Sequence, residues 1–157
     1  MPRAAPGYGG SAMAYREDPQ RLQFFVHHRW ADAPAQMLAP VLVGALERSG
    51  RFQAVLGPDV RARAGLLLQT EDLRLEQLFA KGGSQVRLGA RVSLVDLARD
   101  RVLGSRELVV IEPAARASPE AGAAAANRAL PRFLRELGAF VDASLKTTTP
   151  GLCAAAP

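Results

Sequence analysis

Three runs of alternating residues between positions 65 and 112 constrain the fold of this chain more than any other feature. In the middle run, one face carries only apolar side chains, those of Val86, Leu88, Ala90, Val92 and Leu94. The other face carries Gln85, Arg87, Arg91 and Ser93. A strict period of two over this many positions predicts a strand with one buried face and one wet face.

The runs on either side have a similar character. The preceding run has apolar residues that change phase part-way along, at Leu66, Leu68, Leu73 and Leu75. The following run places Leu103, Val109 and Ile111 on one side and Val102, Leu108 and Val110 on the other. The separators are Lys81–Ser84 and Ala98–Arg101, and the two glycines of the first supply the positive φ that a tight hairpin needs. These patterns predict a three-stranded antiparallel meander, with the rest of the chain covering its apolar face.

Four other segments are expected to extend or border this meander. Arg21–Arg29 alternates with apolar residues on both faces, which predicts a strand inside the sheet rather than at its edge. Arg51–Val55 is expected to form a short strand, and 57–64 a polar loop. Met1–Ser11 is rich in Pro and Gly and lacks apolar periodicity, so we expect it to be disordered or loosely attached.

A first helix is expected over about 34–50. Pro34 suits the first turn behind Asp32 or Ala33, and Gly50 suits a left-handed cap at the other end. Apolar residues recur between them at helical spacing. Pro40 is expected to kink this helix or to make its first turn irregular.

A second helix is expected over about 118–145. Ser118 is placed to cap it and Pro119 to occupy its first position. Its apolar stripe comprises Ala126, Leu130, Phe133, Leu134, Leu137, Phe140 and Val141. Pro131 is expected to interrupt it.

Together these elements predict an α+β fold, a two-layer sandwich with a mostly antiparallel sheet and two main helices packed on one face. A length of 157 residues fits one domain, which we place at 12–146. It is preceded by a disordered segment at 1–11 and followed by a flexible tail at 147–157.

The charge of the chain leaves one functional alternative open. A net charge of +5 and a pI of about 10.3 are compatible with a basic nucleic-acid-binding module. However, 18 of the 20 basic residues are arginines spread along the whole chain, whereas a nucleic-acid footprint should be clustered. We therefore expect no nucleic-acid partner.

Candidate chemical residues do not assemble into a catalytic pattern. His27 and His28 are neighbours on the expected strand and point to opposite faces, so they are poorly placed to share a metal. The nearest carboxylate groupings are Glu71 with Asp72, and Asp96 with Asp100, and a solvated face explains both. We expect no catalytic residue, no cofactor and no metal. A small enzyme that uses Glu71, Asp72 or His27 is the rival interpretation, and it requires a pocket that holds these side chains.

Three further residues have a structural interpretation and a functional one. Trp30, between a strand and a helix, either packs that corner or presents an aromatic ring to a partner. Asn127 lies on the apolar stripe with Leu130 and Leu134, so we expect it to be buried and hydrogen-bonded to a loop or strand. Cys153 is interpreted as an incidental thiol of the tail.

An ordered set of residues resembles the ABC-type transport auxiliary lipoprotein component family over about 8–145. The set begins with Met13–Arg16, Leu22–Phe25, Arg29–Pro34 and Met37-Leu38. It continues with Ala45–Gly50, Phe52, Val95-Asp96, Arg101–Leu103, Ala125–Ala129, Leu134 and Leu137. Within it, the signature positions, structural or partner-facing, are Tyr15, Trp30, Pro34, Leu38, Gly50, Phe52 and Asn127.

The resemblance implies a small non-enzymatic envelope protein. Such proteins work beside the permease and ATPase of an ABC transporter and a substrate-binding protein of the mammalian-cell-entry (MCE) type. The implied cargo is lipid or another hydrophobic molecule, and the implied location is the periplasmic side of the outer membrane, reached through an N-terminal lipidated cysteine. The sequence as given shows neither a signal-peptide core nor a cysteine near residue 1. We also expect an early strand of the relatives to be missing, which would expose a sheet edge and favour a homo-oligomer.

Overall fold

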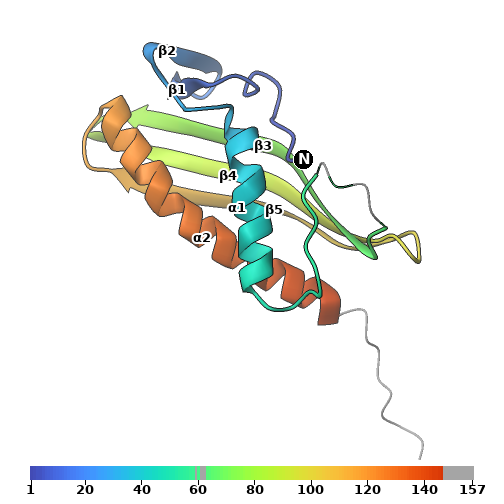
Figure 1. Ribbon diagram of the computed structural model, residues 1–157. Helices are drawn as coiled ribbons and strands as arrows, with labels where there is room; N and C mark the ends of the chain where they lie inside the picture. Colours follow the sequence, from blue (N-terminus) through green and yellow to red (C-terminus); the bar gives the residue numbers. More distant parts are fainter. Residues whose placement is uncertain (59, 61–62, 147–157) are drawn as a thin grey trace, which may run out of the picture.

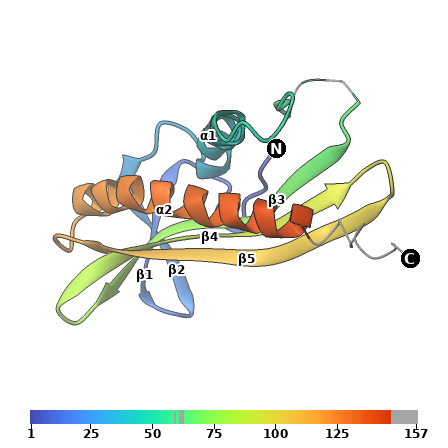
Figure 2. The same ribbon diagram turned by 90° about the horizontal axis from the view of Figure 1, so that it is seen from below.

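The computed structural model describes residues 1–58, 60 and 63–146, and it confirms the α+β prediction. A five-stranded sheet has the order β2-β1-β3-β4-β5, and two helices pack against one of its faces (Figures 1 and 2). The strands are β1 (Ala12–Asp18), β2 (Arg21–Arg29), β3 (Leu66–Ala80), β4 (Gly83–Asp96) and β5 (Arg101–Ala114). The helices are α1 (Pro34–Arg48) and α2 (Pro119–Lys146). All neighbouring strands are antiparallel except β1 and β3, which are parallel.

The predicted meander is the centre of the sheet. Leu75 of β3 is aligned with Leu88 of β4, which is aligned with Val110 of β5, so one apolar row crosses all three strands beneath the helices. The phase change in the sequence of β3 corresponds to a bulge between Glu71 and Arg74. Asp72, inside this bulge, adopts a left-handed φ of 52°. The extra residue keeps apolar side chains directed at the core on both sides of it.

The two turns of the meander form through local chemistry. Gly82 has a φ of 97° in the tight turn after β3, as the Gly-Gly pair predicts. In the turn after β4, the buried Asp96 carboxylate accepts hydrogen bonds from the amides of Ala98 and Arg99, at 3.0 and 3.1 Å. Asp96 therefore stabilises the turn and does not lie on a solvated face.

A second irregularity, between Leu94 and Val95 in their pairing with β5, decides which side of β5 is buried. Leu108 and Val110 are buried beneath α2, whereas Val109 and Ile111 are exposed on the opposite face. Leu103 still packs against the core because the bulge lies next to it.

Helix α1 begins and ends as predicted. Ala33 is the residue before its first turn, with Pro34 at the first position, and the Asp32 carboxylate accepts the Ala33 amide at 2.7 Å. After the helix, Gly50 has a φ of 65°. Pro40 is exposed and the helix runs through it without a break.

Helix α2 also runs without interruption through its internal proline, Pro131. The Ser118 hydroxyl accepts the Ala121 amide at 3.3 Å and so caps the helix, as expected. The prediction for Asn127 was wrong, because this residue is exposed. The buried stripe is centred one position away, on Ala126, Ala129 and Phe133.

Three other predictions are corrected by the structure. Residues 3–8 are not loosely attached: Arg3 and Ala5 donate backbone hydrogen bonds to Thr70 and Leu73 of β3, and Ala5 and Tyr8 are buried. Arg21–Arg29 is an edge strand rather than an internal one, because Ala12–Asp18, for which no strand was predicted, lies between it and β3.

The third correction concerns Arg51–Val55, which is irregular and pairs with no strand. Phe52 instead packs against the core from this segment. The predicted tail at 147–157, with Cys153, lies outside the described residues.

Candidate functional site

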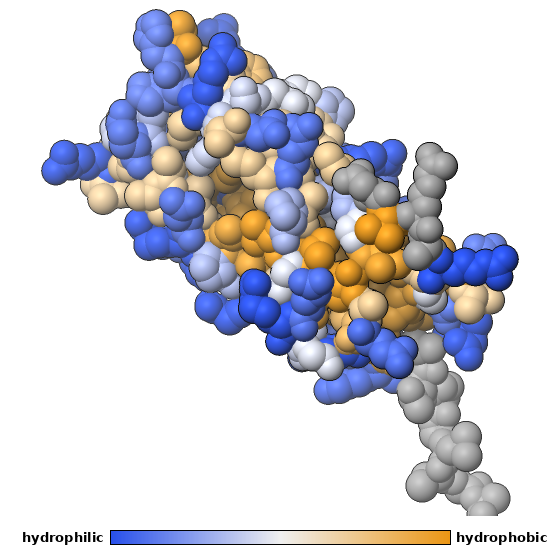
Figure 3. Space-filling model, in the orientation of Figure 1, coloured by the Kyte–Doolittle hydropathy of each residue, from blue (hydrophilic) through white to orange (hydrophobic). Residues whose placement is uncertain are grey.

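A groove of about 440 Å³ separates the C-terminal parts of the two helices. It opens on the helix-covered side of the molecule, where apolar side chains gather between the helices (Figure 3). Its lining is mostly apolar and comprises Ala45, Leu46, Ser49, Arg51, Phe52, Leu134, Arg135, Leu137, Gly138, Ala139 and Asp142.

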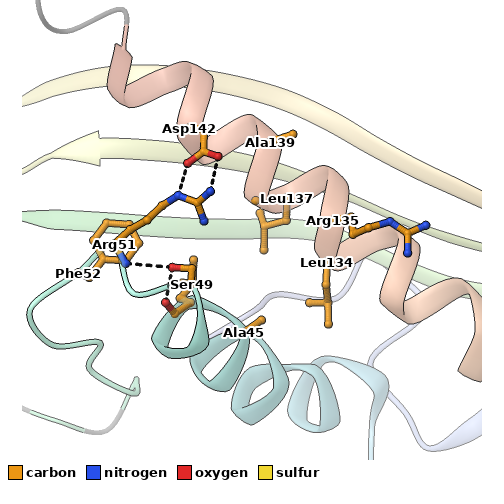
Figure 4. Close-up of a pocket in the computed structure, with 11 residues that line it drawn as sticks. Ala45, Ser49, Arg51, Phe52, Leu134, Arg135, Leu137, Ala139 and Asp142 are labelled. Carbon is orange, nitrogen blue, oxygen red and sulfur yellow. Dashed lines mark hydrogen bonds and ion pairs between the residues drawn. The ribbon is translucent and has the colours of Figure 1, made fainter.

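The groove exists because α1 and α2 are not parallel neighbours. They cross the sheet at an angle to one another (Figure 1). Helix α2 packs mainly on β4 and β5, whereas α1 makes only a few contacts with β3 and with α2. Leu134 points from α2 toward α1, and Phe52 closes one end from the segment after α1 (Figure 4). Apolar side chains of α1 and α2 that would touch if the two helices packed closely face the groove instead.

Most of the polar groups of this groove, those of Ser49, Arg51 and Asp142, lie at one end, and Arg135 lies toward the other (Figure 4). The guanidinium of Arg51 forms an ion pair with the Asp142 carboxylate, with Nη2 2.5 Å from Oδ2 (Figure 4). Ser49 donates its hydroxyl to the Leu46 carbonyl at 2.6 Å, which holds the chain as it leaves α1. A hollow with mostly apolar walls and charged groups toward its ends fits an amphipathic ligand or an apolar side chain.

A second arrangement lies on the helix-free face of the sheet, around Glu76. Its side chain is fully buried, and its Oε2 accepts the Tyr8 hydroxyl at 2.5 Å and the Arg16 Nε at 2.8 Å. Arg87 forms an ion pair with the other carboxylate oxygen. The cluster thus joins the N-terminal segment, β1, β3 and β4.

Competing effects set the ionisation of this cluster. Burial alone would raise the pKa of Glu76, but hydrogen bonds from Tyr8 and Arg16 and the charges of Arg87 and Arg16 outweigh it. The pKa of Glu76 therefore lies below its ordinary value of 4.5. Burial, with the hydrogen bond to Glu76, raises the pKa of Tyr8. A buried carboxylate that stays charged and is paired with two arginines is suited to stabilising the structure.

Where α2 begins, Gln77 and Gly122 are in close contact. The Gln77 amide donates to the Ser84 hydroxyl at 2.8 Å and to the Ser118 carbonyl at 3.0 Å. A Cβ on Gly122 would lie 2.3 Å from the Gln77 Oε1, so a larger residue here would require the Gln77 side chain to shift. Trp30 borders the same region and packs against Val86, Ala125 and Ala126, as the packing interpretation predicts.

The signature positions are dispersed. Tyr15 stacks on Phe25 with ring centroids 4.5 Å apart, and Leu38 is buried in the core. Pro34 and Gly50 stand at the two ends of α1, Trp30 packs at the start of α2, and Asn127 is exposed. Phe52 is the one signature residue that lines the groove.

The rival interpretation as an enzyme is not favoured by these positions. His27 is exposed, and the His28 Nε2 lies 2.9 Å from the Glu120 carboxylate on α2. Glu71 forms an ion pair with Arg3, and the groove between α1 and α2 is lined by none of Glu71, Asp72 and His27.

Many of the arginines among the described residues are paired locally with acids. Seven of them form ion pairs with five carboxylates. Arg16 and Arg87 share Glu76, Arg128 and Arg132 share Glu112, and the other three are Arg3, Arg51 and Arg99. Much of the positive charge that suggested a nucleic-acid module is therefore locally compensated.

Sequence reasoning missed both the groove and the Glu76 cluster. Leu134 and Leu137 were recognised as apolar helix positions, but the sequence does not specify the angle between two helices. Glu76 interrupts the alternation of β3 as a lone acid between Leu75 and Gln77, and its partners are up to 68 residues away. The available indication in the sequence was an acid, Glu76, on one strand and arginines, Arg87 and Arg91, on the polar face of the next.

Comparison with known proteins supports a single assignment. The model of a family described as ABC-type transport auxiliary lipoprotein component matches residues 9–138. The crystal structure of protein XCC0632 from Xanthomonas campestris, described with the family model DUF330, is similar at a TM-score of 0.80 and 26% identity, covering 94% of this chain and 85% of that one.

Another crystal structure, of a protein described as uncharacterized, has a TM-score of 0.62 at 12% identity and covers 88% of this chain and 84% of that one, which shows the fold alone. Among curated proteins, none matches this chain. Neither α1 nor α2 combines the length and apolar character that a helix needs to span a membrane.

Proposed function

Because this chain belongs to the ABC-type transport auxiliary lipoprotein component family, we propose that it is the non-enzymatic auxiliary subunit of an MCE-type transport system. The family is one of auxiliary transport components rather than of enzymes, and it associates the chain with an ABC transport system in the cell envelope. The proposed cargo is lipid or another hydrophobic molecule. The proposed location is the periplasmic side of the outer membrane.

The observation that carries this proposal is the groove between α1 and α2. Its apolar walls, formed by Leu46, Phe52, Leu134 and Leu137, suit an acyl chain. Its volume of about 440 Å³ is comparable to that of one acyl chain and smaller than that of a whole lipid. The Arg51–Asp142 pair lies at the end where a polar headgroup would remain in water.

The proposed partners are the MCE-domain substrate-binding protein and the permease and ATPase of the same system. An auxiliary subunit of this kind acts through protein contacts and through transient exposure of one acyl chain in the groove. The chemistry it supplies is shielding of apolar surface from water, which needs no catalytic side chain.

The test fills the groove without disturbing the core. Ala139 is an exposed residue of α2 that lines the groove, so Ala139→Trp should occupy it while the protein stays folded. Ala124→Trp places the same side chain on an exposed position of α2 away from the groove and serves as the matched control.

Binding of a fluorescent fatty acid and recovery of an MCE protein from envelope membranes are the two measurements. We expect the wild type and Ala124→Trp to bind the fatty acid, and Ala139→Trp to lose about tenfold in affinity or more, because a filled pocket excludes the chain. Equal binding by both variants, or recovery of cytosolic partners alone, would refute the proposal.

A further inference from the structure

In the described part of the chain, three buried side-chain polar atoms form no hydrogen bond with another protein group, namely Trp30 Nε1, Glu76 Oε1 and Gln77 Oε1. The Glu76 atom is compensated, because the Arg87 guanidinium forms an ion pair with it. The Trp30 indole nitrogen, a donor, and the Gln77 amide oxygen, an acceptor, have no comparable contact. Buried polar groups in native proteins are nearly always paired with protein or with ordered water, so these two atoms require an explanation.

Trp30 and Gln77 border the same small cavity, at the place where α2 begins above the sheet. The rest of its wall is mostly apolar and includes Met13, Leu75, Val86 and Gly122. The cavity has a volume of about 10 Å³. A buried water requires roughly 10–15 Å³, so the space suits one water molecule and no larger ligand.

The orientation of the Gln77 amide is fixed by its other hydrogen bonds. Its Nε2 donates to the Ser84 hydroxyl at 2.8 Å and to the Ser118 carbonyl at 3.0 Å. Because a carbonyl only accepts, the contact with Ser118 requires the nitrogen at this position. The Oε1 atom is therefore directed at Gly122, close to the position that a Cβ there would occupy. An acceptor thus lies at the part of the cavity wall that glycine leaves open.

We propose that this cavity is a binding site for one structural water, which accepts a hydrogen bond from the Trp30 indole N–H and donates one to Gln77 Oε1. A buried water needs about two to four polar partners, and this pair offers one donor and one acceptor. A metal ion does not suit the site, because an indole N–H has no lone pair to offer. An apolar ligand would leave both polar atoms without partners, which is unfavourable in a buried position.

The water connects segments that are far apart in the sequence. Trp30 stands between β2 and α1, whereas Gln77 lies on β3 and binds the start of α2 through the Ser118 carbonyl. The Trp30 ring packs against Val86 and Ala126, and the bridging water gives its N–H a separate role. The indole therefore fixes this corner of the molecule both by apolar packing and by a hydrogen bond.

Nuclear magnetic resonance of the wild-type chain tests the site directly. Trp30 is the one tryptophan of the sequence, so its indole N–H gives a single signal that needs no further assignment. We expect NOE and ROE cross-peaks of opposite sign between this proton and water, which is the pattern of a long-lived bound water. Chemical exchange and rapidly exchanging surface water both give peaks of equal sign. A crystal structure supplies a second measurement, in which one ordered water should lie within about 3.2 Å of both Trp30 Nε1 and Gln77 Oε1.

Two glycine variants of α2 test the position of the water. Gly122→Ala places a methyl group on the cavity wall beside Gln77 Oε1, so it should displace the water and abolish the cross-peaks. Gly138→Ala is the matched control on the same helix, because open space surrounds its Cβ position, and it should keep them. The proposal is overturned if the wild type gives no such cross-peaks, if they persist in a folded Gly122→Ala, or if the crystal structure shows a protein group on either atom instead of water. The two wild-type measurements decide the matter if Gly122→Ala does not fold.

Discussion

The Tyr8 hydroxyl donates a hydrogen bond of 2.5 Å to the Glu76 carboxylate across a sequence separation of 68 residues. Both groups are buried on the face of the sheet that the helices leave uncovered. The bond fixes the N-terminal segment against β3 and completes the coordination of a charge that Arg16 and Arg87 neutralise. On a face without helices, this polar cluster replaces the apolar packing found on the other face.

Replacing Tyr8 with phenylalanine should destabilise the protein. The change removes a buried hydrogen bond to a charged acceptor, which corresponds to about 1.5–3 kcal/mol of the free energy of unfolding. Tyr15→Phe is the matched control, because the Tyr15 hydroxyl contacts the neutral Gln23 side chain at 2.8 Å in a partly exposed position. We expect it to cost about 0.5–1 kcal/mol. Urea denaturation measures both, and equal losses would contradict the prediction.

Glu76 should make the free energy of unfolding depend on pH in the acidic range. Its pKa is lower in the folded protein than the ordinary 4.5, so the unfolded chain binds its proton more readily. The stabilisation is therefore complete above about pH 5.5 and is lost as the pH falls below 4.5 through the lower pKa of the folded state.

Comparison with Glu76→Gln isolates this effect from other carboxylates. At pH 7 we expect the variant to be less stable by about 2–3 kcal/mol, because two partly buried arginines lose their counter-charge. The difference from the wild type should shrink as the pH falls below 4.5. Glu107→Gln, at an exposed position of β5, should give a small difference at every pH. A constant difference for Glu76→Gln would argue against the assignment.

Two glycines of α2 should respond in opposite ways to alanine. In Gly122→Ala the new Cβ meets the Gln77 side chain, which its hydrogen bonds to Ser84 and Ser118 hold in place. We expect a loss of about 1–3 kcal/mol. Gly138 has open space around its Cβ position, so Gly138→Ala should gain about 0.5–1 kcal/mol from helix propensity. Thermal unfolding of both variants would show midpoints shifted in opposite directions.

Removal of Arg128 and Arg132, which donate to backbone carbonyls near the end of β5, should cause association. The double variant Arg128→Ala, Arg132→Ala exposes the carbonyls of Ile111 and Pro113, together with the exposed side chains of Val109 and Ile111. We expect concentration-dependent oligomers in light scattering, because an unprotected edge pairs with other strands. Arg106→Ala removes a charge from β5 without uncovering a carbonyl and should stay unassociated. A monodisperse double variant would show that the edge needs no such protection.

The sequence was sufficient where local rules dominate. The alternation of β4 and the phase change in β3 identified the meander, and Pro34, Gly50 and Ser118 identified helix ends, because each depends on neighbouring residues. Pro40 and Pro131 did not break their helices. Packing of α1 and α2 against the sheet stabilises them more than a missing hydrogen bond destabilises them.

What the sequence could not specify depends on distant residues. Ala12–Asp18 carries little alternation of apolar and polar residues. Its strand forms because it pairs with the second half of β3, whose first half is paired with residues 3–5. The apolar residues on both faces of β2 suggested an internal strand, although Phe25 packs on Tyr15 and Phe79 while Val26 remains exposed. Asn127 was misplaced by one position, because Leu130 and Leu134 mark the flank of the stripe near the groove rather than its centre.

The bulge at Asp72 determines how the molecule tolerates changes of length. Leu66 and Leu68 before it, and Leu73 and Leu75 after it, reach the same core only because one surplus residue intervenes. Losing that residue would direct the apolar side chains of half of β3 away from the core. A similar deletion in the segment between α1 and β3 would only shorten a connection. Among homologues, gaps should therefore fall between the first helix and the third strand and should spare this point of the sheet.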